Sequence, residues 1–188
     1  MKKILGLIPC RLGSKRLPGK ALLEINNYPL IVHVFKRAKL SKKLNDVYVC
    51  CDDKKIFKVV KNFGGKAILT SKKHNNGTER IAEAYKILKK KYDLIVDIQG
   101  DEPLINPSHI DKVISFHLKN FKSDIIVPSL KIKQTQNENI VKIVKDNNKN
   151  VLYFSRSSIP FNFKKKKISC SKHLSIISFK PSALIKYS

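Results

Sequence analysis

Four basic side chains near the N-terminus have the types and spacing expected of a phosphate-binding site. They lie within residues 8–20, whose sequence is IPCRLGSKRLPGK, and they are Arg11, Lys15, Arg16 and Lys20. The loop follows an apolar run, residues 4–8, that predicts a buried strand. In a loop that follows a buried strand, basic side chains and backbone N–H groups can together bind the oxygens of a polyphosphate.

The loop differs from a Walker phosphate loop in two ways. Five residues separate Gly13 from Gly19, where a Walker loop has four, and Ala21 stands where a Ser or Thr would bind magnesium. The basic side chains could instead solvate a surface turn. Taken alone, the loop leaves a phosphate site of another kind and a solvated turn equally open.

Two adjacent carboxylates, Asp101 and Glu102, follow another apolar run at residues 94–98. Carboxylate oxygens are the hard ligands that Mg²⁺ prefers. A magnesium ion beside the cationic loop would bridge nucleotide phosphates and neutralise charge as a phosphoryl bond breaks. The alternative is a helix cap or a surface turn, which Pro103 and Pro107 favour.

Three other positions could contact a nucleotide or a sugar. Residues 76–80, NGTER, predict a helix start with Thr78 as the N-cap, and free N–H groups at such a start can also bind a nucleotide. Arg156 follows a β-like run, and the fork of an arginine suits a carboxylate. His173 precedes the last apolar run. Taken singly, Arg156 and His173 are more typical of surface or structural positions.

Strand and helix patterns alternate through the first half of the chain. Strands are predicted at residues 4–8, 47–51, 67–69 and 94–98, and helices from residue 29, at 54–62, from residue 78 and at about 107–119. This alternation predicts an α/β fold with a Rossmann-like, mostly parallel sheet and helices on both faces. Ligands bind beyond the carboxyl ends of such strands, where the cationic loop, Asp52 and Asp53, and residues 99–103 all lie.

The pattern changes after about residue 124. Short β-like runs at 125–130, 140–144, 151–154 and 174–179 alternate with turns. They predict an antiparallel C-terminal addition to the sheet or a small subdomain over the site. We therefore expect a single domain over residues 1–188, with a nucleotide-binding part at about 1–123 and a second part at about 124–188.

The composition limits the classes of protein to which the chain can belong. The formal net charge is +25, but the lysines are scattered, apart from one run at 164–167, and no nucleic-acid-binding motif accompanies them. We therefore favour solvated faces over a nucleic-acid surface. The four cysteines have no disulfide or zinc spacing, which predicts reduced core thiols. Without a membrane-length apolar run or a signal peptide, the sequence predicts a cytoplasmic protein with no membrane partner.

Taken together and in order, these segments resemble the 3-deoxy-manno-octulosonate cytidylyltransferase (CMP-Kdo synthetase) family. The matching segments are IPxRxxSxRLPGK at 8–20, GTER at 77–80, QGDEP at 99–103, VKIV at 141–144, YFSR at 153–156 and HL at 173–174. They span essentially all 188 residues. A single match would be weak, whereas six in sequence are highly specific.

The resemblance implies a nucleotide-diphospho-sugar transferase-like fold, a requirement for Mg²⁺ and a homodimer. It also implies transfer of CMP from CTP to the sugar acid Kdo, with release of pyrophosphate, for lipopolysaccharide synthesis. By position, the residues implied to bind CTP are Pro9, Arg11, Ser14, Gly77, Thr78 and Arg80. Those implied to assist the transfer are Lys20, Arg16 and Asp101, of which Asp101 would also bind the metal. Those implied to face the sugar acid are Gln99, Arg156 and His173.

The sequence also departs from the family. Family members continue well beyond the position of Ser188, so we expect a chain that lacks the family's C-terminal segment and its second metal-binding aspartate. The Gly13-Ser14-Lys15 tripeptide is similar to that of acylneuraminate cytidylyltransferases. The acceptor is therefore Kdo, its 8-amino analogue or another ulosonic acid. The competing class is an inactive basic relative that binds nucleotide or nucleic acid.

Overall fold

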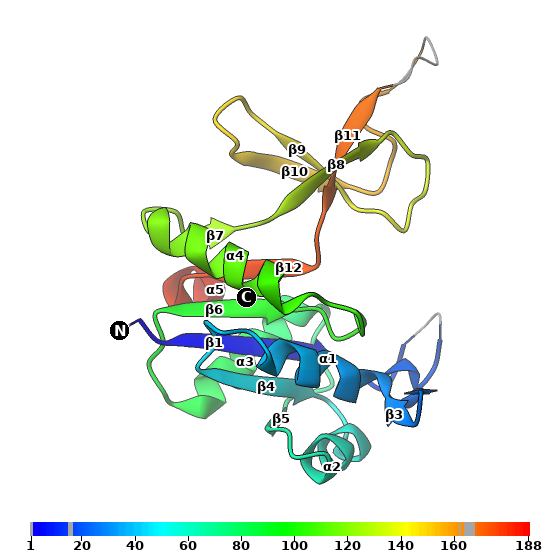
Figure 1. Ribbon diagram of the computed structural model, residues 1–188, viewed down its shortest axis with the longest axis vertical. Coiled ribbons are helices and arrows are strands. Elements are labelled where there is room, and N and C mark those ends of the chain that lie inside the picture. Colours follow the sequence, from blue (N-terminus) through cyan, green and yellow to red (C-terminus); the bar gives the residue numbers. More distant parts are fainter. Residues whose placement is uncertain (1, 15–16, 162, 164–167) are drawn as a thin grey trace. The chain divides into compact units, whose positions relative to one another are not determined.

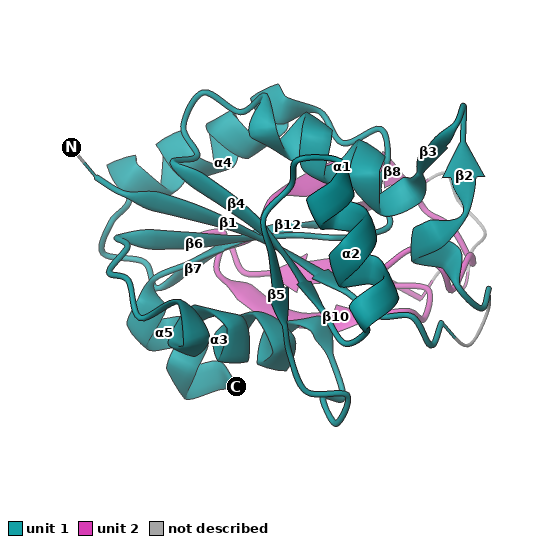
Figure 2. Ribbon diagram, turned by 90° about the horizontal axis from the view of Figure 1, so that it is seen from below, with its two compact units in different colours: residues 1–126, 175–188 teal, residues 127–174 magenta. Residues whose placement is uncertain are grey.

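The computed structural model describes residues 2–14, 17–161, 163 and 168–188 (Figure 1). The chain forms two compact units (Figure 2). The first contains residues 1–126 and 175–188, and the second contains residues 127–174. The last strand and the last helix therefore return to the first unit, whereas the sequence pattern had assigned everything after about residue 124 to one second part.

A six-stranded sheet forms the centre of the first unit, in the order β5-β4-β1-β6-β12-β7. Its strands are β1 (Ile4–Cys10), β4 (Asp46–Cys51), β5 (Ala67–Leu69), β6 (Leu94–Ile98), β7 (Ile125–Ile126) and β12 (Ile176–Phe179). The first four are parallel, and β12 runs antiparallel to β6. The predicted mostly parallel sheet is confirmed.

Helices cover both faces of this sheet, as the alternating pattern predicted (Figure 2). On one face lie α1 (Leu30–Lys39), α2 (Lys54–Asn62) and α4 (Pro107–Lys119). On the other lie α3 (Gly77–Leu88) and α5 (Pro181–Tyr187). Successive side chains of a strand point to opposite faces, so β1 sends Ile4 and Ile8 into the first layer and Leu5 and Leu7 into the second.

Helix starts are fixed by short polar side chains. Asp53 caps α2 by accepting a hydrogen bond from Lys55 N, and Asn106 caps α4 just before Pro107. The expectation that Thr78 caps α3 is wrong. Asn76 is the N-cap, because its side-chain oxygen accepts from Glu79 N and the helix already begins at Gly77.

The second unit contains a four-stranded antiparallel sheet in the order β10-β9-β11-β8. Its strands are β8 (Ser129–Lys133), β9 (Lys142–Lys145), β10 (Val151–Ser155) and β11 (Ser169–His173). This confirms the antiparallel addition. The boundaries differ, because two of the predicted β-like runs each cross between units. Residues 125–130 divide into β7 and β8, and residues 174–179 begin just after β11 and continue into β12.

Beside the cationic loop, the first unit also contains a two-stranded ribbon of β2 (Glu24–Ile25) and β3 (Tyr28–Pro29). No helix in the described part of the chain is long and apolar enough to cross a membrane.

Candidate active site

The carboxyl ends of β1, β4 and β6 bring the candidate residues of the first unit together. These three strands are adjacent and parallel, so the segments that follow them emerge at one edge of the sheet. The cationic loop follows β1, Asp52 follows β4, and residues 99–102 follow β6.

Lys20 and Asp101 lie in direct contact at this edge. The Lys20 ammonium is 3.0 Å from the Asp101 carboxylate, although the two residues are 81 positions apart in the sequence. Both side chains are partly exposed, so a ligand can reach them. The structure therefore places the cation predicted for phosphate beside the carboxylate predicted for metal.

The other residues of the cationic loop divide into those that the structure describes and those that it does not. Arg11 is exposed and Ser14 is partly exposed. Gly19 adopts a left-handed backbone, with φ of 67°, and its N–H donates to Leu12 O at 3.2 Å, which closes the loop just before Lys20. Arg16, predicted to assist the transfer, lies outside the described residues together with Lys15.

Pro9 lies at the point where three elements meet. A Cβ on Gly100 would be 2.5 Å from the Pro9 carbonyl oxygen, so the loop that carries Asp101 can pass this close only with glycine. A Cβ on Gly77 would be 3.1 Å from the Pro9 ring. The N-terminus of α3, with Gly77 and the partly exposed Thr78, therefore packs against the end of β1.

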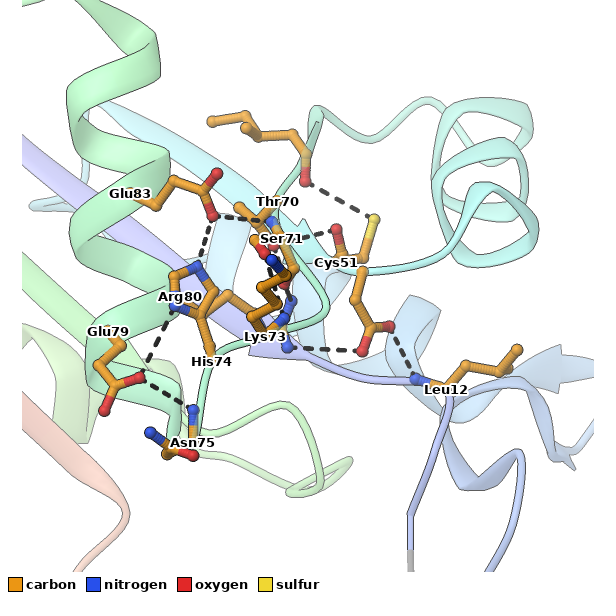
Figure 3. Close-up of polar contacts among 12 residues, drawn as sticks. Leu12, Cys51, Thr70, Ser71, Lys73, His74, Asn75, Glu79, Arg80 and Glu83 are labelled. Atoms are coloured by element: carbon orange, nitrogen blue, oxygen red, sulfur yellow. Dashed lines mark hydrogen bonds and ion pairs between the residues drawn. The ribbon is translucent and has the colours of Figure 1, made fainter.

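Arg80 was predicted to line the nucleotide pocket, and it proves to be buried, with only 3% of its surface exposed. Its guanidinium donates to Thr70 Oγ1 at 2.7 Å and to the Ser71 carbonyl at 3.1 Å (Figure 3). It also contacts Asp52 Oδ2 at 3.4 Å. These contacts hold the Arg80 guanidinium inside the protein.

Asp52 connects that arginine to the cationic loop. Its other carboxylate oxygen, Oδ1, accepts a hydrogen bond from Leu12 N at 3.0 Å. One carboxylate thus links α3, through Arg80, to the first residues after β1. The strand pattern predicts Asp52 and Asp53 at this edge but assigns them no role. The position of Asp52 directly after a buried strand is the signal that could have identified it.

The loop before α3 is held by a second set of contacts (Figure 3). Glu83 accepts from Ser71 N at 2.8 Å and contacts the His74 ring at 2.5 Å. Burial raises the pKa of Glu83, but the hydrogen bonds from His74 and Ser71 outweigh it and hold that pKa below its usual value. Glu79 accepts from Asn75 N at 2.9 Å. Sequence reasoning did not identify this cluster.

The side-chain amide of Gln99 is hydrogen-bonded to a buried carboxyl group. Its Nε2 atom donates to both oxygens of Asp97, at 3.2 and 3.1 Å. Asp97 is only 2% exposed. Burial raises the pKa of the Asp97 carboxyl to about 7, although the hydrogen bond from Gln99 acts in the opposite direction.

The four cysteines lie in the interior of the units that contain them. Cys10, Cys50, Cys51 and Cys170 are all free and buried, which confirms the prediction of reduced core thiols. Burial raises the pKa of the Cys51 thiol to about 11 and also raises the pKa values of Cys10 and Cys50. These thiols stay protonated near neutral pH and are poor nucleophiles.

Two of the predicted sugar-binding residues belong to the second unit. Arg156 follows β10 and donates to the Glu138 carbonyl at 2.8 Å. His173 ends β11, and its ring lies 5.4 Å from the Phe154 ring, centroid to centroid. Arg156 and His173 are therefore carried by the same antiparallel sheet, whereas Gln99 belongs to the first unit.

Comparison with known proteins extends these observations. A family model described as cytidylyltransferase matches residues 5–188. A 3-deoxy-manno-octulosonate cytidylyltransferase of Thermodesulfovibrio yellowstonii is 47% identical over 168 residues, which cover 85% of this chain and 66% of that protein. An 8-amino-3,8-dideoxy-manno-octulosonate cytidylyltransferase of Shewanella pealeana is 43% identical over 180 residues, which cover 92% of this chain and 73% of that protein.

The fold of this chain is also similar to that of a solved structure. It is described as CMP:2-keto-3-deoxy-manno-octonic acid synthetase complexed with CTP, and it matches with a TM-score of 0.88 at 34% identity. The match covers 98% of this chain and 77% of that one. The chain thus spans only part of the length of each of these proteins, and 66% in the case of the Thermodesulfovibrio relative.

Proposed function

Because the chain belongs to the cytidylyltransferase family, we propose that it transfers CMP from CTP to 3-deoxy-manno-octulosonate and releases pyrophosphate. The observation that carries the proposal is the 3.0 Å contact between Lys20 and Asp101. A cation suited to phosphate and a carboxylate suited to a metal ion lie side by side at the carboxyl edge of a parallel sheet. A relative at 47% identity bears the name of this activity.

In the proposed reaction, the anomeric hydroxyl of the sugar acid attacks the α-phosphorus of CTP. A bond forms from that oxygen to the α-phosphorus, the bond to the bridging oxygen breaks, pyrophosphate leaves, and the hydroxyl proton passes to solvent. Such a transfer depends mainly on positioning and charge neutralisation. We assign the phosphates to Lys20, Arg11, Ser14 and Arg16, and the nucleoside to the surface formed by Pro9, Gly77 and Thr78.

Asp101 is suited to a magnesium site at which substrate and water supply most of the ligands. Among the described residues, no three or more His, Cys, Asp or Glu side chains gather as a metal cluster. Mg²⁺ commonly takes one or two carboxylates and completes its shell with substrate phosphates and water, so a single partly exposed carboxylate suits it. A bound Mg²⁺ would supply neutralisation of the phosphate charge.

We assign the sugar acid to Gln99 of the first unit and to Arg156 and His173 of the second. Arg156 supports this proposal because a guanidinium binds a carboxylate through two parallel hydrogen bonds. A second acceptor, the 8-amino analogue of Kdo, is favoured by the 43% identical Shewanella relative that carries its name.

Release of pyrophosphate tests the proposal. The chain is incubated with CTP and Mg²⁺ and, in separate reactions, with Kdo, 8-amino-Kdo or a sialic acid. We expect release that requires both CTP and Kdo. Release with 8-amino-Kdo alone would transfer the assignment to the second acceptor, and no release with any of the three sugars would contradict the proposed reaction.

We further propose that the chain is a cytoplasmic homodimer. The support for the homodimer is β10, an edge strand of the second sheet, on which Leu152, Tyr153 and Phe154 are exposed. Exposed apolar edge strands favour pairing with another chain. Light scattering coupled to gel filtration tests this, and a monomer at micromolar concentration would contradict it.

A further inference from the structure

The strand that leads to Gln99 contains one carboxyl group among apolar side chains. Strand β6 reads Leu-Ile-Val-Asp-Ile, and all five residues are buried. Its neighbours in register with Asp97 are Leu7 of β1 and Ile177 of β12, both apolar. A carboxyl group at such a position contributes little to the fold, because a hydrophobic residue would be at least as stable there.

The contacts of Asp97 determine how the neighbouring amide is oriented. Both oxygens of Asp97 accept from Nε2 of Gln99. An ionised carboxylate can only accept hydrogen bonds, so it selects the rotamer of Gln99 that turns the donor end of the amide inward. Oε1, at the opposite end of the amide, is then the atom that Gln99 offers to a ligand.

We propose that Asp97 is a positioning residue for the acceptor sugar, which acts by fixing Gln99 with Oε1 available to a hydrogen-bond donor of the substrate. The inference rests on the proposed function, because it takes Gln99 as a sugar-binding residue. It adds a chemical preference: this position of the site accepts a hydroxyl or an amino group and disfavours an acceptor-only group.

The titratable and charged groups around Asp97 come from two neighbouring elements, β4 and α3. Cys50 of β4 lies close enough for the Asp97 charge to raise the pKa of its thiol. On α3, which packs on the same face, the buried charged residue is Arg80, whose guanidinium is engaged by Thr70, Ser71 and Asp52. Helix α5 contributes Leu184 to this layer.

The direction of the pH effect follows from the chemistry of the carboxyl group. Burial raises the Asp97 pKa to about 7, so the group begins to protonate just below neutral pH. A protonated carboxyl can donate to Oε1 of Gln99, which permits the reversed amide. We therefore expect the KM for the sugar to rise as the pH falls from 8 to 6, while the KM for CTP stays nearly constant.

Two substitutions test the role. Asp97→Ala removes the partner of Gln99, and we expect the KM for Kdo to rise about tenfold, the equivalent of one hydrogen bond, with the KM for CTP within about twofold. In Asp97→Asn the side chain can accept or donate, so we expect a smaller rise that no longer depends on pH between 6 and 8. An unchanged KM for Kdo in Asp97→Ala would overturn the proposal.

A matched control comes from the adjacent strand. Ser178 of β12 is also fully buried and polar, and it hydrogen-bonds the His117 ring at 2.7 Å on α4. Ser178→Ala should lower the melting temperature without changing the ratio of the two KM values. If Ser178→Ala altered the KM for Kdo as strongly as Asp97→Ala does, the effect would be one of stability and the proposal would be wrong.

A spectroscopic readout keeps this inference separate from the proposed reaction. The side-chain NH₂ signals of Gln99, identified in ¹⁵N-labelled protein by their loss in Gln99→Glu, should shift with pH around a midpoint near 7 and stay constant in Asp97→Asn. A wild-type signal that is constant from pH 5.5 to 8.5 would overturn the inference. A shifting signal in a chain that releases no pyrophosphate would reject the proposed reaction and still support the Asp97–Gln99 coupling.

Discussion

Lys20 and Asp101 form an ion pair at the carboxyl edge of the central sheet. Their side chains are partly exposed, so the pair itself adds little to stability. In the proposed reaction, the pair holds an ammonium group and a carboxylate at one place before the ligand binds. Such preorganised charge is worth far more to a transition state, in which phosphate charge is redistributed, than to the folded protein.

The first prediction concerns that lysine. We expect Lys20→Ala to lower kcat by about two to three orders of magnitude and to change the KM for Kdo by less than about threefold, because the ammonium acts on the phosphates. Steady-state pyrophosphate release at saturating CTP, measured over a range of Kdo concentrations, gives both constants. Weaker CTP binding with an unchanged kcat at saturation would contradict this role.

A second prediction concerns Asp97 and stability. Because burial raises its pKa from 3.8 to about 7, the folded state binds more protons than the unfolded state between these values. Stability contributed by this group therefore falls as the pH rises from about 4 to about 7. We expect Asp97→Asn to be more stable than wild type at pH 8, by up to a few kcal/mol, and nearly equal at pH 4. Urea unfolding at both pH values checks this, and a wild type that is the more stable protein at pH 8 would disprove it.

At the scale of elements, one carboxylate connects three segments. Asp52 accepts from Leu12 N after β1 and pairs with Arg80 of α3, whose guanidinium also holds Thr70 and Ser71. The arrangement explains why the start of the cationic loop has a defined position next to the N-terminus of α3. It also explains why Arg80 is buried, since its hydrogen-bond donors are used inside the protein.

The third prediction follows from this connection. Asp52→Ala leaves the buried Arg80 guanidinium and Leu12 N–H without their carboxylate, so we expect a loss of about 3 kcal/mol in the free energy of unfolding and a higher KM for CTP. Asp53→Ala is the matched control, because the Asp53 side chain caps α2. It should cost about 1 kcal/mol and leave the KM for CTP unchanged. Equal effects of the two substitutions on that KM would refute the assignment.

At the scale of the whole molecule, the net charge of +25 is the dominant property. Charge of one sign destabilises a compact state through self-repulsion, and salt screens it over a Debye length of about 10 Å at 0.1 M. The charge is spread over the sequence, and the proposed ligand needs only the few cations of the carboxyl edge. General repulsion and specific phosphate binding should therefore respond to salt in opposite ways.

The fourth prediction uses that difference. Raising NaCl from 0.05 to 0.5 M should raise the melting temperature of the free chain by several degrees, because repulsion is screened. The KM for CTP should increase over the same range, because phosphate contacts are screened as well. Differential scanning fluorimetry and pyrophosphate release measure the two quantities. A melting temperature that falls with salt would show that attractive ion pairs outweigh the repulsion.

Much of the fold could be predicted from local sequence patterns. The apolar runs of β1 and β6 and the helix periodicity between them predict a parallel core. These patterns can be recognised in the sequence because each extends over only about ten residues. The runs at 125–130 and 174–179 could not be resolved in this way. Each looks continuous in sequence, yet the chain passes from one unit to the other inside it.

The sequence by itself determined the kind of chemistry, because the basic loop and the QGDEP segment carry their side-chain types regardless of context. Only the tertiary structure decided which of these groups meet. Lys20 contacts Asp101, 81 positions away in the sequence, and Arg80 is buried against Asp52. Asp97 accepts a hydrogen bond from Gln99. The physical reason is that burial and long-range contact depend on how whole elements pack, and no local pattern contains that information.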